Sequence, residues 1–287
     1  MSDLLVVILF GITQGSIYAA VALGLVLVFG ITDIVNFAHG ELVTLGAFGV
    51  ILFSPVLGVP TAILVTLVVV AVLAAGLYAG GFKFTVGNHL QALVLSLAVL
   101  LVVQNLMLRE FSTSPRRGPS LSGFVELPGG DRIATTRLLV LVALCLVVVG
   151  LAVLLRRSWI GLALRACGDD RVAATTLGMS PRRIGRYAFI LSGLLAAAAG
   201  IAIAASYPVT PLTGAAFLLK GFAVVIVGGL GSVTGALVAG LAFGVLESFG
   251  ATYLSPSITN VYAFVFMIVV LLVAPRGLFG RKVGRAG

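Results

Sequence analysis

The stretch "LLVVILFGITQGSIYAAVALGLVLVFG", residues 4–30, decides the fold class. It carries no charged side chain over its whole length. An α-helix rises ~1.5 Å per residue, so roughly 20 apolar residues cross the ~30 Å hydrocarbon layer of a bilayer. Because no Lys or Arg precedes the run and it is long for a cleavable signal, we expect it to be a first membrane span.

The composition extends this expectation to the whole chain. Of the 287 residues, 60% are hydrophobic and 9% charged, and the mean hydropathy is +1.23. These values lie outside the range of soluble domains and exclude a large soluble part. We predict an all-α polytopic membrane protein with one transmembrane domain over residues 1–287 and about nine spans, with eight to ten as the open range. The expected spans are 4–30, 36–53, 60–82, 89–108, 137–155, 186–206, 215–232, 234–253 and 258–274.

Basic residues predict the orientation. The loop 156–186 holds seven arginines and the tail after residue 275 is also basic, so the positive-inside rule places both in the cytoplasm. With nine spans the N-terminus and the loop 109–136 then lie outside. Counting Lys220 with the outer group gives 12 basic residues inside and 6 outside, which sum to the 18 of the chain. An even span count requires a re-entrant segment, for which the Gly-rich residues 215–235 are the candidate.

Other functional classes find little support. The net charge of +9 comes without a basic stripe interleaved with aromatic residues, so no nucleic-acid partner is expected. Cys145 and Cys167 are expected to be free thiols, and with His89 as the only histidine besides His39, no metal site is expected. No GxxxxGK[ST] phosphate loop is present, so energy must come from a partner or an ion gradient.

The segment "DDRVAATTLGMSPRR", residues 169–183, predicts a helix within the cytoplasmic loop. Asp169 and Asp170 suit a helix N-terminus, Gly178 a C-terminal break, and Ser180 with Pro181 the start of the next helix. Ala173, Ala174 and Leu177 would share one smooth face that could seat in a groove of another protein. The alternative is an amphipathic helix lying on anionic lipid headgroups.

Three stretches together resemble one family. Ala173, Ala174 and Gly178 resemble the coupling-helix signature of permease subunits in ATP-binding-cassette (ABC) importers. Residues 15–48, "GSIYAAVALGLVLVFGITDIVNFAHGELVTLGAF", and residues 218–248, "LLKGFAVVIVGGLGSVTGALVAGLAFGVLES", resemble branched-chain amino acid permeases of the LivH type. Related permeases carry urea or short amides, so these substrates remain alternatives.

The resemblance implies a non-catalytic subunit of the bacterial inner membrane that forms a translocation path by alternating access. Its implied partners are a second permease of the LivM type, two cytoplasmic ATPases that bind ATP and Mg, and a periplasmic amino-acid-binding protein. The residues it assigns to ATPase coupling are Arg165, Asp169, Asp170, Ala173, Ala174, Leu177 and Gly178.

The segment "NFAHGEL", residues 36–42, concentrates polar groups in an apolar surrounding. Helical spacing puts Asn36, Gly40 and Thr44 on one small stripe, together with Ala47, whereas His39 and Glu41 point to nearly opposite sides and cannot readily pair with each other. Asn36 and His39 are candidates for interhelical hydrogen bonding or for contact with substrate. An ionised acid at mid-bilayer costs about 2.5 to 3.5 kcal/mol, so Glu41 should face protein or a water-filled path.

Glu247 is the other acid in a long apolar run. Ala236, Gly240 and Gly244 form a small-residue stripe that ends at Glu247 and predicts close helix packing. Asn36, His39, Glu41, Thr44 and Glu247 are the candidates for the translocation path or its gate. An ion-coupled transporter using Asp33, Glu41 or Glu247 and a membrane-embedded enzyme are the competing classes, although the chain lacks a clear nucleophile and base pair.

Overall fold

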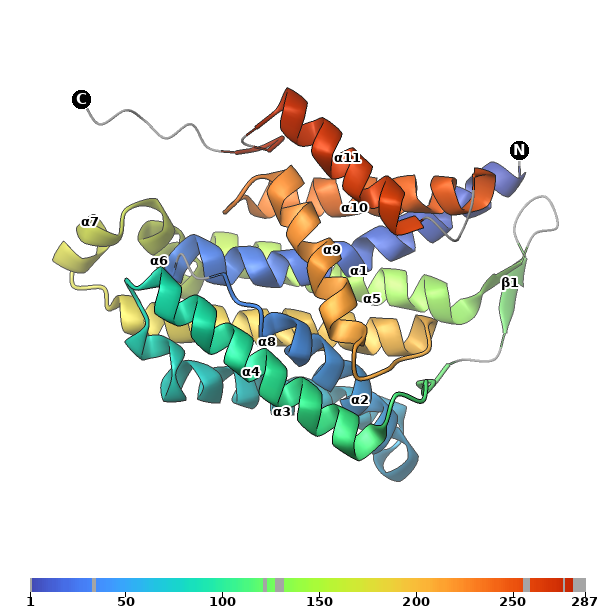
Figure 1. Ribbon diagram of the computed structural model, residues 1–287, viewed down its shortest axis with the longest axis horizontal. Helices are drawn as coiled ribbons and strands as arrows, with labels where there is room; N and C mark the ends of the chain where they lie inside the picture. The colour runs from blue at the N-terminus through green and yellow to red at the C-terminus, as the bar shows by residue number, and fades with distance from the viewer. Residues whose placement is uncertain are drawn as a thin grey trace.

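The structure is a computed structural model that describes residues 2–32, 35–120, 123–126, 132–254, 259–275 and 277–280. Helices dominate it (Figure 1). The helices are α1 (Ser2–Thr32), α2 (His39–Leu57), α3 (Val59–Gly80), α4 (His89–Phe111), α5 (Thr135–Arg157), α6 (Trp159–Asp169), α7 (Arg171–Thr176), α8 (Pro181–Ser206), α9 (Thr213–Gly228), α10 (Val233–Tyr253) and α11 (Thr259–Val273), with a 3-10 turn at Phe82–Phe84.

Each predicted span coincides with a helix, and no boundary is displaced by more than five residues. By length and composition, seven helices of the described chain can cross a membrane: α1, α2, α3, α4, α5, α8 and α10. Helix α9 has 16 residues and extends ~24 Å, which is less than the hydrocarbon layer. Figure 1 shows α9 crossing the bundle at a steep angle to α1, α5 and α8, so it differs from the full spans in both length and direction.

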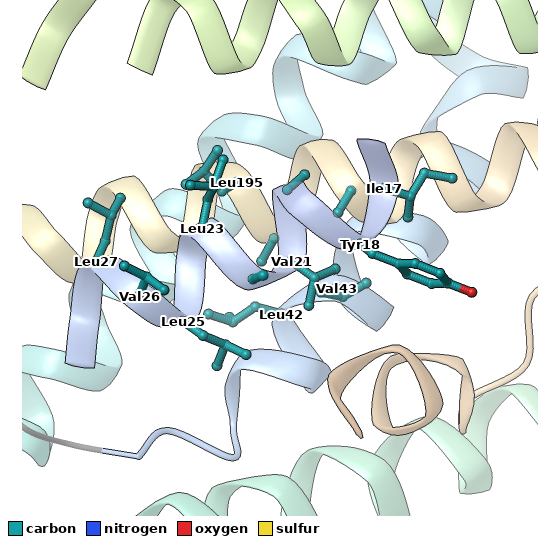
Figure 2. Close-up of a cluster of buried hydrophobic side chains, with 14 of the residues drawn as sticks. Ile17, Tyr18, Val21, Leu23, Leu25, Val26, Leu27, Leu42, Val43 and Leu195 are labelled. Atoms are coloured by element: carbon teal, nitrogen blue, oxygen red, sulfur yellow. The ribbon is translucent and has the colours of Figure 1, made fainter. Parts of the chain in front are cut away.

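Helix α1 lies at the centre of the bundle because it is apolar on all sides. Such a helix must be surrounded by protein or lipid, and α1 packs against α8, α9 and α10. Figure 2 shows Val21, Leu25 and Leu195 among the aliphatic side chains gathered there. The same view shows the Tyr18 ring with its hydroxyl pointing away from these aliphatic groups, toward a polar surrounding described below.

Small residues bring α1 and α10 into contact, as their spacing predicted. A Cβ at Gly244 would lie 2.1 Å from the Gly15 nitrogen, and one at Gly240 would lie 2.8 Å from the Ala19 Cα. Contacts below 3.0 Å leave no room for a side chain, so the two backbones are as close as glycine permits. Gly240 and Gly244 of the predicted stripe therefore pack on α1.

The turn between α9 and α10 is tight and is covered by the C-terminal segment. Gly229 and Gly231 adopt positive φ angles of 99° and 84°, which glycine tolerates. The Leu278 nitrogen donates to the Val227 carbonyl at 2.8 Å, and the Phe279 nitrogen donates to the Gly228 carbonyl at 3.1 Å. Residues 228–232 therefore form a tight turn between α9 and α10.

The two long loops lie at opposite ends of the bundle. Figure 1 shows α6 and α7 at one end and β1 at the other, beside the start of α1. A Cβ at Gly168 would lie 2.8 Å from the Gly30 carbonyl oxygen, so α6 lies at the end where α1 finishes. The single helix α5 separates the two loops and places them at opposite ends, as the predicted topology requires.

The loop between α4 and α5 contains a hairpin that the helical prediction missed. Strand β1 (Phe124–Glu126) pairs antiparallel with β2 (Arg132–Ala134), with Val125 opposite Ile133. An exposed ion pair of 2.8 Å joins Arg132 to Glu126. Strands of three residues give too little alternation for a sequence pattern to reveal them.

Candidate functional site

A buried ion pair joins two helices within the membrane-spanning part of the chain. The Lys220 ammonium of α9 donates to Glu247 Oε1 of α10 at 2.5 Å, and to the Tyr18 hydroxyl of α1 at 2.9 Å. Tyr18 in turn donates to Glu247 Oε2. The side chains of Lys220 and Glu247 are 19% and 8% exposed. Three helices thus contribute to one desolvated group of charges.

The hydrogen bonds continue from this ion pair toward the end of the bundle that holds the hairpin. Gln14 Nε2 donates to the Tyr18 hydroxyl at 2.6 Å, and the Tyr207 hydroxyl donates to Gln14 Oε1. The Arg137 guanidinium lies 6.0 Å from the Tyr207 ring centre and 4.0 Å from the Phe10 ring centre. We call Gln14, Tyr18, Tyr207, Lys220 and Glu247 the polar network.

Aromatic rings enclose the inner part of the polar network. The Phe217 ring centre lies 5.8 Å from that of Tyr18, and the Phe243 ring centre lies 6.3 Å away in an edge-on arrangement. In such a low-dielectric surrounding, leaving one charge of a close pair without its partner is costly. The site therefore combines two opposite charges with apolar walls.

Lys220 was placed wrongly by the charge count. The sequence assignment put it with the outer basic residues, whereas it lies midway along α9 and is paired with Glu247. When Lys220 is removed from the outer group, the predicted orientation has 12 basic residues inside and 5 outside, instead of 12 and 6. The available signal was two isolated opposite charges in neighbouring apolar segments, a pattern that favours intramembrane pairing. Gln14, Tyr18 and Tyr207 gave no comparable signal.

His39 joins three helices. Its Nε2 lies 3.2 Å from the Val21 carbonyl oxygen of α1, and its Nδ1 lies 3.0 Å from Ser192 Oγ of α8. The side chain is fully buried. A Cβ at Gly24 would lie 2.4 Å from His39 Cε1, so the ring fills the space opposite that glycine. This geometry is that of an interhelical hydrogen-bonding residue.

The helical part of the small stripe, with Gly40 and Thr44, packs as its spacing predicted, whereas Asn36 precedes α2 and does not lie on this face. A Cβ at Gly214 would lie 1.9 Å from the Gly40 carbonyl oxygen, and the Gly214 nitrogen donates to Thr44 Oγ1 at 3.1 Å. Asn36 acts locally, because its Oδ1 accepts from the Ala38 nitrogen at 3.1 Å before α2 begins. Neither Asn36 nor Thr44 joins the polar network.

Glu41 lies apart from His39 and from Glu247. Its side chain is 1% exposed, and neither carboxylate oxygen has a hydrogen-bond partner among the residues that the structure describes. The expectation that Glu41 faces protein is met. Asp33, the remaining acid named for ion coupling, lies outside the described residues.

The arginine-rich loop folds into two short helices before α8. Asp170 caps α7, since its Oδ1 accepts from the Val172 and Ala173 nitrogens at 2.8 and 2.9 Å. Gly178 has a φ of 82° and breaks the chain before Ser180 and Pro181 begin α8. The predicted break and restart are therefore confirmed.

Two details of this loop differ from the prediction. Asp169 is the last residue of α6 and so does not lie at a helix N-terminus, because Asp170 alone takes the cap position. Ala173, Ala174 and Leu177 do not form one face: Ala174 is buried, whereas Ala173 is exposed and Leu177 is 78% exposed. Val172, 75% exposed, joins them on the outside, so the apolar surface of α7 is bulkier than expected.

The remaining residues assigned to coupling flank this surface. Arg165 is exposed on α6, and its Nε donates to the Gly161 carbonyl at 3.4 Å. Cys167 is buried beside it, and desolvation raises the pKa of its thiol, with Arg171 opposing that rise. Cys145 is exposed on α5, and both cysteines are free thiols.

Long apolar helices, an ion pair buried between α9 and α10, and the short loop helices α6 and α7 characterise a polytopic membrane protein with a charged site between its helices. Residues 7–274 match the family described as branched-chain amino acid transport system / permease component. The chain belongs to this family.

Curated relatives agree with the family match. The permease protein BraD of Pseudomonas aeruginosa is 31% identical over 94% of both chains. LivH of Escherichia coli is 30% identical, again over 94% of both chains. LivM of Escherichia coli is 32% identical over 59% of this chain and 40% of its own length. All three are named as high-affinity branched-chain amino acid transport system permease proteins.

Proposed function

We propose that this chain is a permease subunit of an ABC importer and forms part of the path for branched-chain amino acids. The family match and the names of BraD and LivH support the substrate class. Transport would proceed by alternating access, in which each bound partner favours one of two states. The chain itself would catalyse no reaction, and ATP and Mg would bind on separate ATPase subunits.

The observation that carries this proposal furthest is the ion pair of Lys220 and Glu247. A free amino acid is a zwitterion, so its carboxylate suits Lys220 and its ammonium suits Glu247. When the substrate binds, the Lys220–Glu247 ion pair would be replaced by two ion pairs, one between Lys220 and the substrate carboxylate and one between Glu247 and the substrate ammonium. No charge is then left unpaired, which avoids the free-energy cost of an isolated charge in an apolar site. The Phe217 and Phe243 rings beside Tyr18 offer contact area for an aliphatic side chain. Neutral urea or a short amide would not use these charges.

The proposed partners follow from the family and from the relatives. Likeness to LivM supports assembly with a second, related permease. Two ATPases would dock on the cytoplasmic side, and a periplasmic binding protein would deliver substrate. The positive-inside rule supports an inner-membrane orientation with the N-terminus outside and the C-terminus in the cytoplasm.

Helix α7 is the proposed contact for the ATPases. Val172 and Leu177 supply exposed apolar anchors, and Asp170 fixes the start of the helix. We expect Leu177→Glu and Ala173→Glu to reduce ATPase co-purification and uptake, because a charge would be buried on docking. Val125→Glu, an exposed position at the opposite end, is the control and should retain the ATPases.

Uptake into reconstituted vesicles tests the whole proposal. The complex is reconstituted with its binding protein, and labelled leucine uptake is measured with internal or external ATP, with an ion gradient alone, and with excess urea. We expect uptake that requires ATP on the side of α7 and that urea does not reduce. Uptake driven by the gradient without any ATPase would establish the ion-coupled class instead.

A further inference from the structure

An apolar groove runs along the outside of the bundle between α3 and α5, with α8 as its floor. Its cavity volume is about 640 Å³. The lining includes Ile63 and Leu67 of α3, Val147 and Leu154 of α5, and Leu191 and Leu194 of α8. Nothing in the polar network or the NFAHGEL segment contributes to it.

The groove is long. Along α5 it extends from Thr136 to Leu154, which is ~27 Å at the helical rise and nearly the thickness of the hydrocarbon layer. An extended acyl chain can therefore lie along it, in contact with apolar side chains of three helices.

Basic residues from two helices lie just beyond one end of the groove. On α5, Val147, Gly150 and Leu154 line it, and the same spacing of three and four residues continues to Arg157. On α8, the stripe that contains Leu194 and Leu191 continues through Tyr187 to Arg183. Both arginines are exposed.

Aromatic residues mark the same end as a membrane interface. Trp159 follows Arg157 by two residues and is 67% exposed. Tyr187 lies between Arg183 and the lining residue Leu191. Exposed Trp and Tyr side chains are enriched at the level of lipid headgroups, and basic pockets between spans on the cytoplasmic side bind anionic headgroups.

We propose that this groove binds an anionic phospholipid of the cytoplasmic leaflet, with its phosphate between Arg157 and Arg183 and an acyl chain along Leu154, Leu191 and Leu194. The opposite charges of headgroup and arginines select the lipid, and the apolar walls hold its chain. The inference rests on the proposed function only for the orientation that puts Arg157 in the cytoplasmic leaflet.

Two sets of variants separate headgroup from chain. Arg157→Gln with Arg183→Gln removes the cationic end, and Arg109→Gln with Arg117→Gln makes the same charge change at the other end as a control. Gly150→Leu fills the groove, since a Cβ at Gly150 meets nothing within 4 Å, and Gly76→Leu, equally unobstructed on the outer face of α3, is its control.

The complete transporter is purified with equal amounts of phosphatidylglycerol and phosphatidylcholine, and the retained lipids are measured by mass spectrometry. We expect retained phosphatidylglycerol to exceed phosphatidylcholine in the parent protein and both controls. At about a tenfold effect for each 1.4 kcal/mol and ~1 kcal/mol per arginine, the double arginine variant should lose this preference by roughly thirtyfold. Gly150→Leu should lower retention of both lipids.

Several results would overturn the lipid site. Equal lipid preference in the parent and the double arginine variant would exclude the headgroup contact. Unchanged retention in Gly150→Leu would exclude the groove, and inorganic phosphate that displaces the lipid signal completely would show that the acyl chain plays no part. Lipid retention is measured without transport. A failure of the vesicle uptake assay would therefore count against the proposed function and not against the lipid site, and the reverse also holds.

Discussion

Replacing Lys220 with methionine tests whether the ion pair is a site for substrate or only a structural contact. The substitution keeps a long apolar side chain but removes the partner of Glu247, which is 8% exposed. Breaking a buried pair from one side costs about 3 to 5 kcal/mol, because it leaves an uncompensated charge. At about 2 to 4 °C for each kcal/mol in a chain of this size, the melting temperature should fall by roughly 6 °C or more.

A second variant separates stability from transport. Lys220→Met combined with Glu247→Leu removes both charges, and apolar replacement of a buried pair is often neutral or stabilising. We expect the double variant to melt within about 3 °C of the parent, which corresponds to roughly 1 kcal/mol. Its ATP-dependent leucine uptake should nevertheless remain below a tenth of the parent rate, since no charges remain to meet the zwitterion.

The assay measures the melting temperature of the purified complex and leucine uptake by the same preparation in vesicles. Two outcomes would refute the reasoning. If Lys220→Met melts with the parent, the ion pair contributes little to stability. If the double variant regains both stability and uptake, the charges serve only to hold α9 against α10, and the path lies elsewhere.

Other predictions concern packing, capping and thiol chemistry. Gly214→Ala places a Cβ 1.9 Å from the Gly40 carbonyl oxygen and should destabilise the complex by about 1 to 3 kcal/mol, measured by thermal melting. Gly76→Ala, where a Cβ meets no atom within 4 Å, is the control and should melt like the parent. Equal melting temperatures of the two variants would contradict the close contact. Asp170→Ala removes the N-cap of α7 with its two hydrogen bonds and should cost about 1 kcal/mol, seen as faster hydrogen exchange of the α7 amides, while Asp170→Asn should exchange like the parent. Burial raises the pKa of the Cys167 thiol, so its thiolate forms at higher pH than in an unfolded chain. In the Cys145→Ser background, the rate of maleimide labelling of Cys167 should therefore keep rising above the pH at which the rate in SDS-denatured protein levels off. Coincident pH profiles for folded and denatured protein would show that the pKa is not raised.

The helices were predictable because long apolar runs bounded by charged residues, Gly or Pro are visible in the sequence itself. Each of the nine predicted segments coincides with a helix to within five residues, seven of them long enough to cross a membrane, and Gly240 with Gly244 identified the close face of α10. The restart at Pro181 also followed from local chemistry. In each case the physical cause lies within one helix or one turn.

Contacts between distant segments were not predictable in the same way. The sequence did not decide whether the segment around Lys220 crosses the membrane or re-enters it. The pairing of Lys220 with Glu247 depends on where α9 lies in three dimensions. Ala173 and Ala174 have the same side chain, and only the packing of α7 on the bundle buries one and exposes the other. Tyr18 lies in an apolar helix, and its two charged partners, Lys220 and Glu247, come from residues more than 200 positions away.

Helix α9 is held at both ends. Near its start, Gly214 lies against Gly40 of α2, and at its end Gly228 is joined to the turn before α10 and to Phe279. Lys220 lies about halfway between these attachments, so α9 cannot tilt alone without breaking one of them. In the proposed alternating access, a movement that keeps these contacts carries α2, α9 and α10 together and leaves the Lys220 ammonium fixed relative to all three helices.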